Sequence, residues 1–561
     1  MLQVCRQLCE IIKSSLFLQY ILTLDKSGYQ LPFYPRVDLD YAQMIQVLRD
    51  NHDGWRSLNK LSNPSFIDIV SHDVGYRPFV DGVFAYTPRK YPDDTPDEPI
   101  TTIHFHQLPS INKGTEYRYW NHSLNWNVFD VVIQPEIDLL ALLTYNCLPS
   151  DKQSYHIHLR TMSTNDPHPL AALHALPLPF LDSSDVTPNQ LIMQDGLLSI
   201  HGRMIGLHLR EGGSALGPLT MIWDWMAGTK VAHLVFPSST LYFIRFISEE
   251  YFIVSRSPEP DESHRYKKLG CLEVYPLPLD RDYMRPFARL MLPESSKRLD
   301  FVFLGIDGNI PAPSTRTTRP HSKPSIYAST SENGQLCVMI SVEAEGYACG
   351  WLCVSTKALL KFLHEANAPN PGPLEHSEPL EISWSTWGGY ASWIPHFGSE
   401  THAPFILGQR CAALRVDHTI IKGHKVYSKD LYVIDFDQNR SKDNPLSETS
   451  GQVVSSEPTF PNRPREAHES PGNVALGDRI AQIMFREAFH SDARYSKINV
   501  TLEETEELLR EKGLDDADTE DDYDSILSQC LQEVMIDDEH VVLVVSKEYD
   551  YAPAGILVYN V

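Results

Sequence analysis

Apolar residues in the central and C-terminal parts of the chain come in short runs that alternate with polar residues, and Gly, Pro, Asn and Asp bound these runs. A period of two is typical of β-strands with one buried face, and the bounding residues are typical of turns. One strand pattern, rich in Ile, Val, Leu and aromatic residues, returns seven times, in segments that begin at Ile103, Ile157, Ile222, Leu272, Trp351, Leu431 and Ile556. The chain is therefore predicted to be mainly β and built from a repeated unit.

Most copies of this strand follow a hairpin with an acidic residue at or beside its turn, as in the segments that start at Phe129, Leu241, Cys411 and Val534. A hairpin with one added strand cannot bury both of its faces, whereas repetition around an axis packs each small sheet on the next. We predict a seven-bladed β-propeller-like domain, in which residues 66–70 complete the last blade and join the two ends of the ring. A β-sandwich is the alternative, and it explains the strands without explaining the seven copies.

Helical periodicity is clear only near the two ends of the chain. One apolar stripe consists of Leu2, Cys5, Leu8, Cys9 and Ile12. A second helix is predicted to carry Leu39, Ala42, Ile45 and Leu48 on its apolar stripe and to have Asp38 as its N-cap, and further helices are predicted over residues 475–489 and 502–509. The chain divides into a short helical segment, residues 1–60, and a propeller-like domain, residues 61–561, with polar loop insertions notably at 438–473 and 490–530.

The charge balance limits the classes of partner. Acidic residues outnumber basic ones by 73 to 48, which gives a formal net charge of −25. This charge repels phosphate backbones and anionic lipids, so we expect no nucleic acid and no membrane as partner. Nine scattered cysteines fit a reducing compartment. The longest apolar run, residues 14–24, is too short to span a bilayer and lacks the cleavage site of a signal peptide. We expect a cytoplasmic or nuclear protein.

Two His-x-His pairs are the main candidates for metal chemistry, His104/His106 and His156/His158. Residues two apart on a strand point the same way, so each pair offers two imidazoles, whereas a zinc site needs at least three protein ligands. A structural role is therefore favoured, with metal binding as the alternative. The chain has no P-loop, no G-x-S-x-G and no H-E-x-x-H motif. We expect no enzyme activity and no cofactor.

Five tryptophans suggest two different roles. Trp223 and Trp225 alternate along a strand, which favours packing between blades. Trp384, Trp387 and Trp393 lie among Ser and Gly residues, which suggests that part of this group is on a loop. Exposed aromatic residues are frequent hot spots of protein interfaces. These three tryptophans are therefore our candidates for partner binding.

Several stretches spread over the chain are similar to one protein family. They are VCRQLCEIIKSSLFLQYILTL from Val4, VLRDNHDGWRSL from Val47, FVDGVFAY from Phe79, IHLRTMSTNDPHPLA from Ile157, MIWDWMAGTKVAHL from Met221, WGGYASWIPHFG from Trp387, LYVIDFD from Leu431 and VMIDDEHVVLVV from Val534. The chain resembles the F-box proteins of mushroom-forming fungi, whose C-terminal part is a degenerate β-propeller.

The resemblance implies a substrate receptor of a cullin–RING ubiquitin ligase. In such receptors an N-terminal helical module docks on a Skp-type adaptor, and the C-terminal domain holds the protein to be ubiquitinated. Only the tail of an F-box is visible here, so the expected adaptor-binding residues are reduced to Leu2, Val4, Cys5 and Leu8. We expect weak or no adaptor binding by this chain as it stands. The alternatives are a propeller scaffold without a ligase link and, less favoured, a propeller-fold hydrolase.

Overall fold

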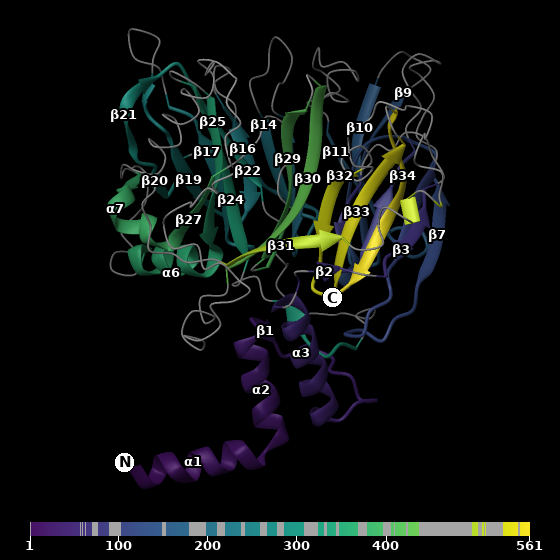
Figure 1. Cartoon of the computed structure of the whole chain (residues 1–561). Coiled ribbons are helices and arrows are strands. Elements are labelled where there is room, and N and C mark those ends of the chain that lie inside the picture. The colour runs from purple at the N-terminus through teal and green to yellow at the C-terminus, as the bar shows by residue number, and fades with distance from the viewer. Residues whose placement is uncertain are drawn as a thin grey trace.

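The computed structural model describes residues 2–56, 58, 60–61, 63–69, 77–88, 102–147, 153–178, 198–209, 219–236, 242–258, 266–277, 285–307, 324–329, 334–343, 347–367, 379–395, 405–408, 410–421, 424–436, 496–502, 508–509, 511, 531–547 and 550–561. Most of these residues belong to strands, and three helices precede the first large sheet (Figure 1).

Within these ranges the strands form seven sheets of four or five strands each. The first consists of β4 (Phe79–Val80), β5 (Val83–Tyr86), β6 (Thr102–Gln107) and β7 (Arg118–Ser123). The second consists of β8 (Asn127–Gln134), β9 (Leu139–Cys147), β10 (Gln153–Thr161) and β11 (Ala175–Pro177), with the 3-10 turn η2 (Pro135–Ile137) between its first two strands. The third consists of β12 (Leu198–His201), β13 (Met204–Leu209), β14 (Leu219–Asp224) and β15 (Thr229–Val235).

The fourth sheet has five strands, β16 (Tyr242–Phe246), β17 (Tyr251–Arg256), β19 (Cys271–Pro276), β20 (Ala288–Met291) and β26 (Leu380–Ile382). The fifth consists of β22 (Phe301–Asp307), β24 (Gln335–Glu343), β25 (Tyr347–Ser355) and β27 (Ala391–Pro395). Helices α6 (Thr356–Asn367) and α7 (Trp384–Trp387) and the 3-10 turn η5 (Gly388–Tyr390) accompany these two sheets, and β18 (Tyr266–Lys268) pairs separately with β21 (Glu294–Leu299).

The sixth sheet consists of β28 (Phe405–Leu407), β29 (Arg410–Ile421), β30 (His424–Asp435), β31 (Ser496–Leu502) and the short β2 (Lys60–Leu61). The seventh consists of β32 (Leu531–Ile536), β33 (His540–Lys547), β34 (Asp550–Asn560) and β3 (Ser65–Asp68). A small separate sheet joins β1 (Tyr29–Gln30) to β23 (Ala328–Ser329).

The recurring strand of the sequence occupies the same place in every sheet. Its seven copies lie in β6, β10, β14, β19, β25, β30 and β34, each of which is the third strand of its sheet. An inner strand has neighbours on both edges and packed sheets on both faces, so its sequence becomes almost continuously apolar. The residue at the start of each copy is accordingly buried, from Ile103 to Ile556. The predicted equivalence of the seven strands is confirmed.

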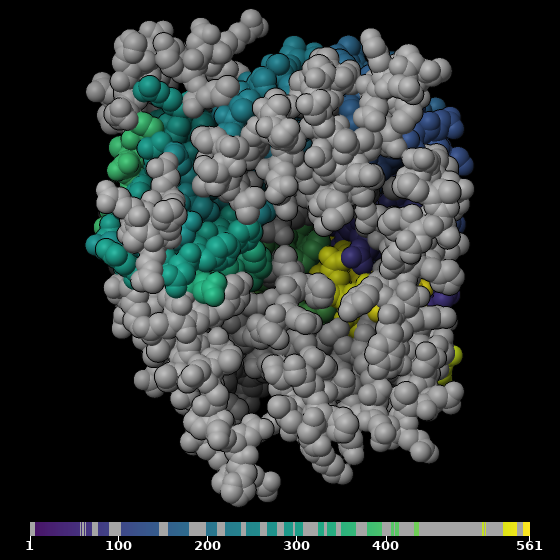
Figure 2. Space-filling model, turned by 90° about the horizontal axis from the view of Figure 1, so that it is seen from above, coloured from purple at the N-terminus to yellow at the C-terminus, as the bar shows by residue number. Residues whose placement is uncertain are grey.

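The seventh sheet joins the two ends of the ring. Strand β3 pairs antiparallel with β34, Ser65 opposite Val558 and Asp68 opposite Gly555. A side chain at position 555 would collide with the ring of Phe66, so glycine allows the two strands to approach. Seen from above, yellow C-terminal residues lie beside purple residues from the start of the ring (Figure 2). The prediction that residues 66–70 complete the last blade is confirmed for residues 66–68, residue 70 lies outside the described residues, and the sandwich alternative is wrong.

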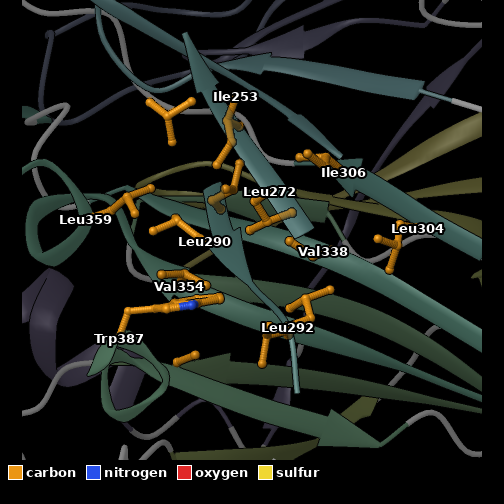
Figure 3. Close-up of a cluster of buried hydrophobic side chains, with 14 of the residues drawn as sticks. Ile253, Leu272, Leu290, Leu292, Leu304, Ile306, Val338, Val354, Leu359 and Trp387 are labelled. Atoms are coloured by element: carbon orange, nitrogen blue, oxygen red, sulfur yellow. The ribbon is translucent and has the colours of Figure 1, made fainter. Parts of the chain in front are cut away.

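Apolar side chains fill the space between consecutive sheets. The largest cluster joins the fourth and fifth sheets and includes residues of α6 and α7. Figure 3 shows this cluster, in which Ile253 and Leu272 from the fourth sheet lie together with Val338 from the fifth. All three side chains are fully buried. Packing of this kind is the main stabilising force of a ring of small sheets.

One sequence-based element prediction is wrong in the C-terminal half, and a second, the helix over 502–509, holds only for part of its described residues. The hairpin from Cys411 was expected to turn near Asp417, but Asp417 lies inside β29, opposite Ser428, and the two strands pair over 12 residues each. Val, Thr and Ile on both sides of the acidic residue keep the strand extended. Leu502 ends strand β31, whereas Leu508 and Leu509 are helical. The helix predicted over 475–489 lies outside the described residues.

Three helices precede the ring, α1 (Leu2–Ser14), α2 (Leu16–Lys26) and α3 (Tyr41–Arg56). Helix α2 is the apolar run considered above as a signal segment, and the side chain of Ser15 caps it by accepting from the Leu18 N–H. Asp40 caps α3 in a reciprocal pair with Gln43, whereas Asp38 binds the guanidinium of Arg36. The prediction of Asp38 as N-cap is wrong. None of the described helices is long and apolar enough to cross a membrane.

Candidate functional site

Apolar side chains are exposed on the first two helices. Figure 1 shows α1 projecting away from the ring, and its end continues into α2. The exposed residues, called here the apolar helix surface, are Leu8 (53%), Ile11 (54%), Leu16 (48%), Phe17 (41%) and Leu22 (51%). Of the predicted adaptor-binding residues, Leu8 belongs to this surface. Leu2, Val4 and Cys5 lie in α1, but their side chains are outside the described part of the structure.

Helices α2 and α3 have a core of their own, completed by a segment from far along the chain. Residues Ile326 and Tyr327, between β22 and β24, are buried against Tyr20 of α2 and Leu48 of α3. The ring of Tyr327 stacks on Tyr29, with 4.1 Å between the ring centroids. The segment between β22 and β24 therefore holds the helices, together called the helical module, onto the ring.

The turn between β32 and β33 is the polar centre of this junction. The backbone oxygen of Asp538 accepts hydrogen bonds from Asn51 Nδ2 at 2.7 Å and from Trp55 Nε1 at 3.0 Å. Its carboxylate accepts from the hydroxyls of Tyr29 at 3.3 Å and Ser329 at 2.5 Å. Burial raises the pKa of Asp538 to about 6, although the Ser329 hydrogen bond and the charge of Arg410 act in the opposite direction. One turn thus binds both Tyr29, which follows α2, and helix α3.

Arg410, at the start of β29, supplies the positive charge next to this carboxylate. Its guanidinium lies 4.5 Å from the centroid of the Trp55 ring and 3.5 Å from the Tyr29 hydroxyl. A desolvated guanidinium over an indole is one of the stronger cation–π arrangements. The sixth sheet is therefore also tied to α3.

The same turn ties the seventh sheet to the first. His540 Nδ1 lies 2.8 Å and 2.9 Å from the two carboxylate oxygens of Asp537, and Nε2 lies 2.8 Å from the carbonyl oxygen of Pro109. Both ring nitrogens face acceptors, so the imidazolium form satisfies both contacts. Burial lowers the pKa of His540, but the charge and hydrogen bond of Asp537 outweigh it, and the pKa lies above its ordinary value. Glu539 accepts from the Asn112 N–H at 2.8 Å.

A cavity of about 680 Å³ opens beside this turn. Its walls include residues of the first strands of five different sheets, β4, β8, β12, β16 and β28, so these strands face one another around it. We call it the axial cavity. Phe33 and Tyr34, from the linker between α2 and α3, also line it and are 46% and 42% exposed. The axial cavity therefore lies where the ring meets the helical module.

Negative side chains predominate in the axial cavity. Its lining includes the seven carboxylates Asp81, Glu116, Glu136, Asp138, Asp537, Asp538 and Glu539, and the three cations Lys113, Arg118 and Arg245. Lys113 is paired with the carboxylate of Asp81, and the Arg118 guanidinium lies 5.1 Å from the Trp120 ring centroid. The cavity thus has an excess of negative charge, in keeping with the balance of the whole chain.

Most of these carboxylates already have structural partners. Asp138 accepts from both the backbone N–H and the hydroxyl of Ser163, and Asp537, Asp538 and Glu539 make the contacts given above. A hydrolytic centre needs a nucleophile, a base and an orienting group that converge on one reacting atom. The carboxylates of the cavity instead contact different structural partners and do not converge on one atom. Among the described residues, no cluster of three or more His, Cys, Asp or Glu could hold a metal ion.

The tryptophans proposed as partner-binding residues belong largely to the core. Trp387 is 2% exposed, and its Nε1 donates to the carbonyl oxygen of Met291 at 3.0 Å. Trp384 and Trp393 are half-buried against the same cluster as Trp387. The prediction of partner binding assumed exposed tryptophans, and it is wrong for Trp387, which is buried. Partner binding by Trp384 and Trp393 stays a prediction. Trp223 and Trp225 are buried between sheets, as predicted.

The first histidine pair is bound to tyrosines. Nδ1 of His104 lies 2.7 Å from the hydroxyl of Tyr119, and Nδ1 of His106 lies 2.9 Å from that of Tyr117. Burial, and to a lesser extent the charge of His104, lowers the pKa of His106 to about 4. In the second pair, His158 stacks on Trp126 with 4.1 Å between ring centroids. These contacts favour a structural role for His104, His106 and His158.

Sequence reasoning missed the residues that form the junction. Tyr29, Asp538 and Arg410 come from three distant parts of the chain, and no local motif joins them. The one available signal was the run from Asp537 to His540 at a predicted hairpin turn. One acidic residue is enough to keep a turn in solvent, so three in a row indicate a further role. Their contacts depend on the closure of the ring, which places the seventh sheet next to the first.

The sheet order and the axial cavity define a β-propeller with an N-terminal helical module. No known protein family matches the chain, and no curated protein matches it. Among solved structures, the C-terminal WD40 domain of Sif2 is similar at 8% identity and a TM-score of 0.34, over 90% of this chain and 99% of that one. The β-propeller domain of the Trilobed protease from Pyrococcus furiosus is similar at 11% identity and a TM-score of 0.25, over 67% and 93%. The assignment of the fold rests on the strand order of this chain itself.

Proposed function

We propose that this protein is a non-catalytic interaction module that acts as an F-box-type substrate receptor of a cullin–RING ubiquitin ligase. The helical module docks on a Skp-type adaptor, and the propeller holds the target protein. The observation that carries this proposal is the apolar helix surface. Half-exposed apolar residues next to a helix pair that has its own core are what a docking element requires.

The size of this surface fixes the strength of binding that we expect. Its five side chains are already about half-buried, so covering each contributes about 1 kcal/mol. Association costs an estimated ~4–15 kcal/mol in lost freedom before any affinity appears. The gain of about 5 kcal/mol from the five side chains offsets only the low end of this cost, so we expect weak binding at best.

The experiment is a calorimetric titration of the purified chain with a purified Skp-type adaptor. The double variant Ile11→Asp/Phe17→Asp should abolish the heat of binding. Val37→Asp is the matched control. Val37 is 94% exposed in the same module, and this substitution also replaces an apolar residue with a charged one. Unaltered binding by the double variant would show that this surface is not the docking element. Failure of the wild-type chain itself to bind would overturn the docking role of this surface and favour the alternative, a propeller scaffold without a ligase link.

Catalysis in the axial cavity is a less favoured function. A hydrolase would need acidic and histidine side chains free to act on a substrate, whereas Asp537 and His540 are bound to each other and to Pro109. The engagement of these groups supports binding over chemistry.

A further inference from the structure

We propose that the axial cavity binds the cationic side chain of a lysine or arginine from a basic peptide segment of a partner protein. The inference deepens the proposed function, because it names the class of target that the propeller holds. It does not depend on adaptor docking, since the cavity and the apolar helix surface share no residue.

The first argument is charge. Seven carboxylates and three cations line the cavity, and one of the cations, Lys113, is already neutralised by Asp81. In a partly enclosed space, unlike charges attract more strongly than in bulk water, so the excess negative charge favours a positive ligand. Of the carboxylates, Glu116 is exposed and makes no side-chain hydrogen bond or ion pair within the described residues. It is available at the edge of the cavity.

The second argument comes from buried polar atoms without partners. Gln134 is 7% exposed and lines the cavity, and its Oε1 finds no hydrogen-bond partner among the described residues. The same holds for the hydroxyl of Tyr327, which is 1% exposed and also lines the cavity. A buried polar atom left unpaired is costly, so two of them in one cavity indicate a missing ligand. An ammonium or guanidinium group supplies the donors that Oε1 lacks.

The third argument concerns the rest of the ligand. A cavity of about 680 Å³ is far larger than a metal ion and fits a long side chain with part of its peptide. Apolar residues of the walls, including Val80, Ile200 and Leu407, suit the aliphatic stem of lysine or arginine. The exposed rings of Phe33 and Tyr34 suit a cation that approaches over an aromatic face.

The test measures fluorescence anisotropy of two labelled peptides with the full chain at about 150 mM salt, a near-physiological ionic strength. One peptide is Gly-Gly-Lys-Arg-Lys-Gly-Gly, and the other has glutamine at the three basic positions. We expect the basic peptide to bind at least about tenfold more tightly than the neutral one. Equal binding of both peptides, or no binding of either, would overturn the proposal.

Two variants locate the binding. Gln134→Met keeps the length of the side chain and removes the acceptor, and Glu116→Gln/Glu136→Gln removes two charges from the lining. Each should weaken binding of the basic peptide by about fivefold. Glu250→Gln is the matched control, because it removes a carboxylate from an exposed turn away from the cavity lining and should change nothing. Glu116 is exposed, so Glu116→Gln alone gives a reading if the other variants fold poorly.

The outcomes separate this inference from the proposed function. If Glu250→Gln weakens binding as much as the cavity variants, the peptide is attracted only by the overall negative charge, and the proposal is wrong. If the cavity variants lose the peptide while calorimetry shows no adaptor binding, the cavity assignment holds and the ligase role fails. Spermine is added as a competitor. If it displaces the peptide but itself binds more tightly than the peptide, the natural ligand is a polyamine rather than a protein, and the proposal is overturned.

Discussion

Different interactions stabilise the contact between the fourth and fifth sheets and the contact between the helical module and the ring. The first is an apolar cluster in which aliphatic side chains and Trp387 exclude water. The second depends on hydrogen bonds and buried charges around Asp538, with Arg410 beside them. Apolar packing tolerates small displacements, whereas hydrogen bonds to one turn fix a single arrangement. The ring is thus held mainly by hydrophobic burial, and the module is placed by directional contacts.

Trp387→Ala should give the largest effect, because it removes a fully packed indole and the hydrogen bond to Met291. We expect the free energy of unfolding to fall by about 4 kcal/mol, measured by urea denaturation. Trp393→Ala, at a half-buried position in the same cluster, is the control and should cost clearly less. Equal losses at the two positions would contradict the distinction between core and partly exposed tryptophans.

Asp538→Ala tests the other side of the comparison. It leaves the Ser329 hydroxyl without its acceptor and the Tyr29 hydroxyl with only the longer contact to Asn51 Oδ1 at 3.5 Å, which should cost about 2–3 kcal/mol. We expect faster hydrogen exchange in α2 and α3, with the third strands of the sheets still protected. Asp25→Ala, at an exposed position of the same module, is the control. Faster exchange spread evenly over the ring would mean that the turn supports the whole fold rather than the docking of the module.

His106, in the first sheet, should lower the free energy of unfolding at acidic pH. Because burial lowers its pKa to about 4, the folded state favours the neutral ring. Its contribution is therefore full above the ordinary pKa of about 6.5 and is lost as the pH falls toward 4. Compared with His106→Gln, the wild type should lose about 1 kcal/mol of stability between pH 7 and 5. A difference between the two proteins that does not change with pH would show that His106 does not titrate differently on folding.

His540, at the junction, should show the opposite sign. Its pKa is raised by Asp537, so its contribution is full below about pH 6.5 and is lost as the pH rises through the raised value. The stability difference between wild type and His540→Gln should shrink by up to about 1 kcal/mol from pH 6 to pH 8.5. Thermal unfolding of both proteins across this range gives the measurement. A difference that grows with pH would mean that the neutral ring is the folded form.

The sequence predicted the parts of the fold that repeat. Alternation and turn residues located the seven third strands, and the need to protect sheet edges located the closing strand at Phe66. The site was not predictable in this way. Tyr29, Tyr327 and Arg410 look like ordinary residues in their own segments, and only closure of the ring brings them to Asp538. Long hairpins were also misread, because Asp417 breaks the apolar pattern of β29 without breaking the strand.

The pairing of β3 with β34 has a consequence for the order of events during synthesis. Ile556, the partner of Ile67, follows it by 556 − 67 = 489 residues. At about 5–20 residues per second, β3 waits roughly 25–100 s with its edge open. Its length of four residues limits the number of backbone groups offered to a wrong partner during that time. A chain that terminates before β34 is made keeps an unpaired β3, by which quality control can distinguish it from a closed ring.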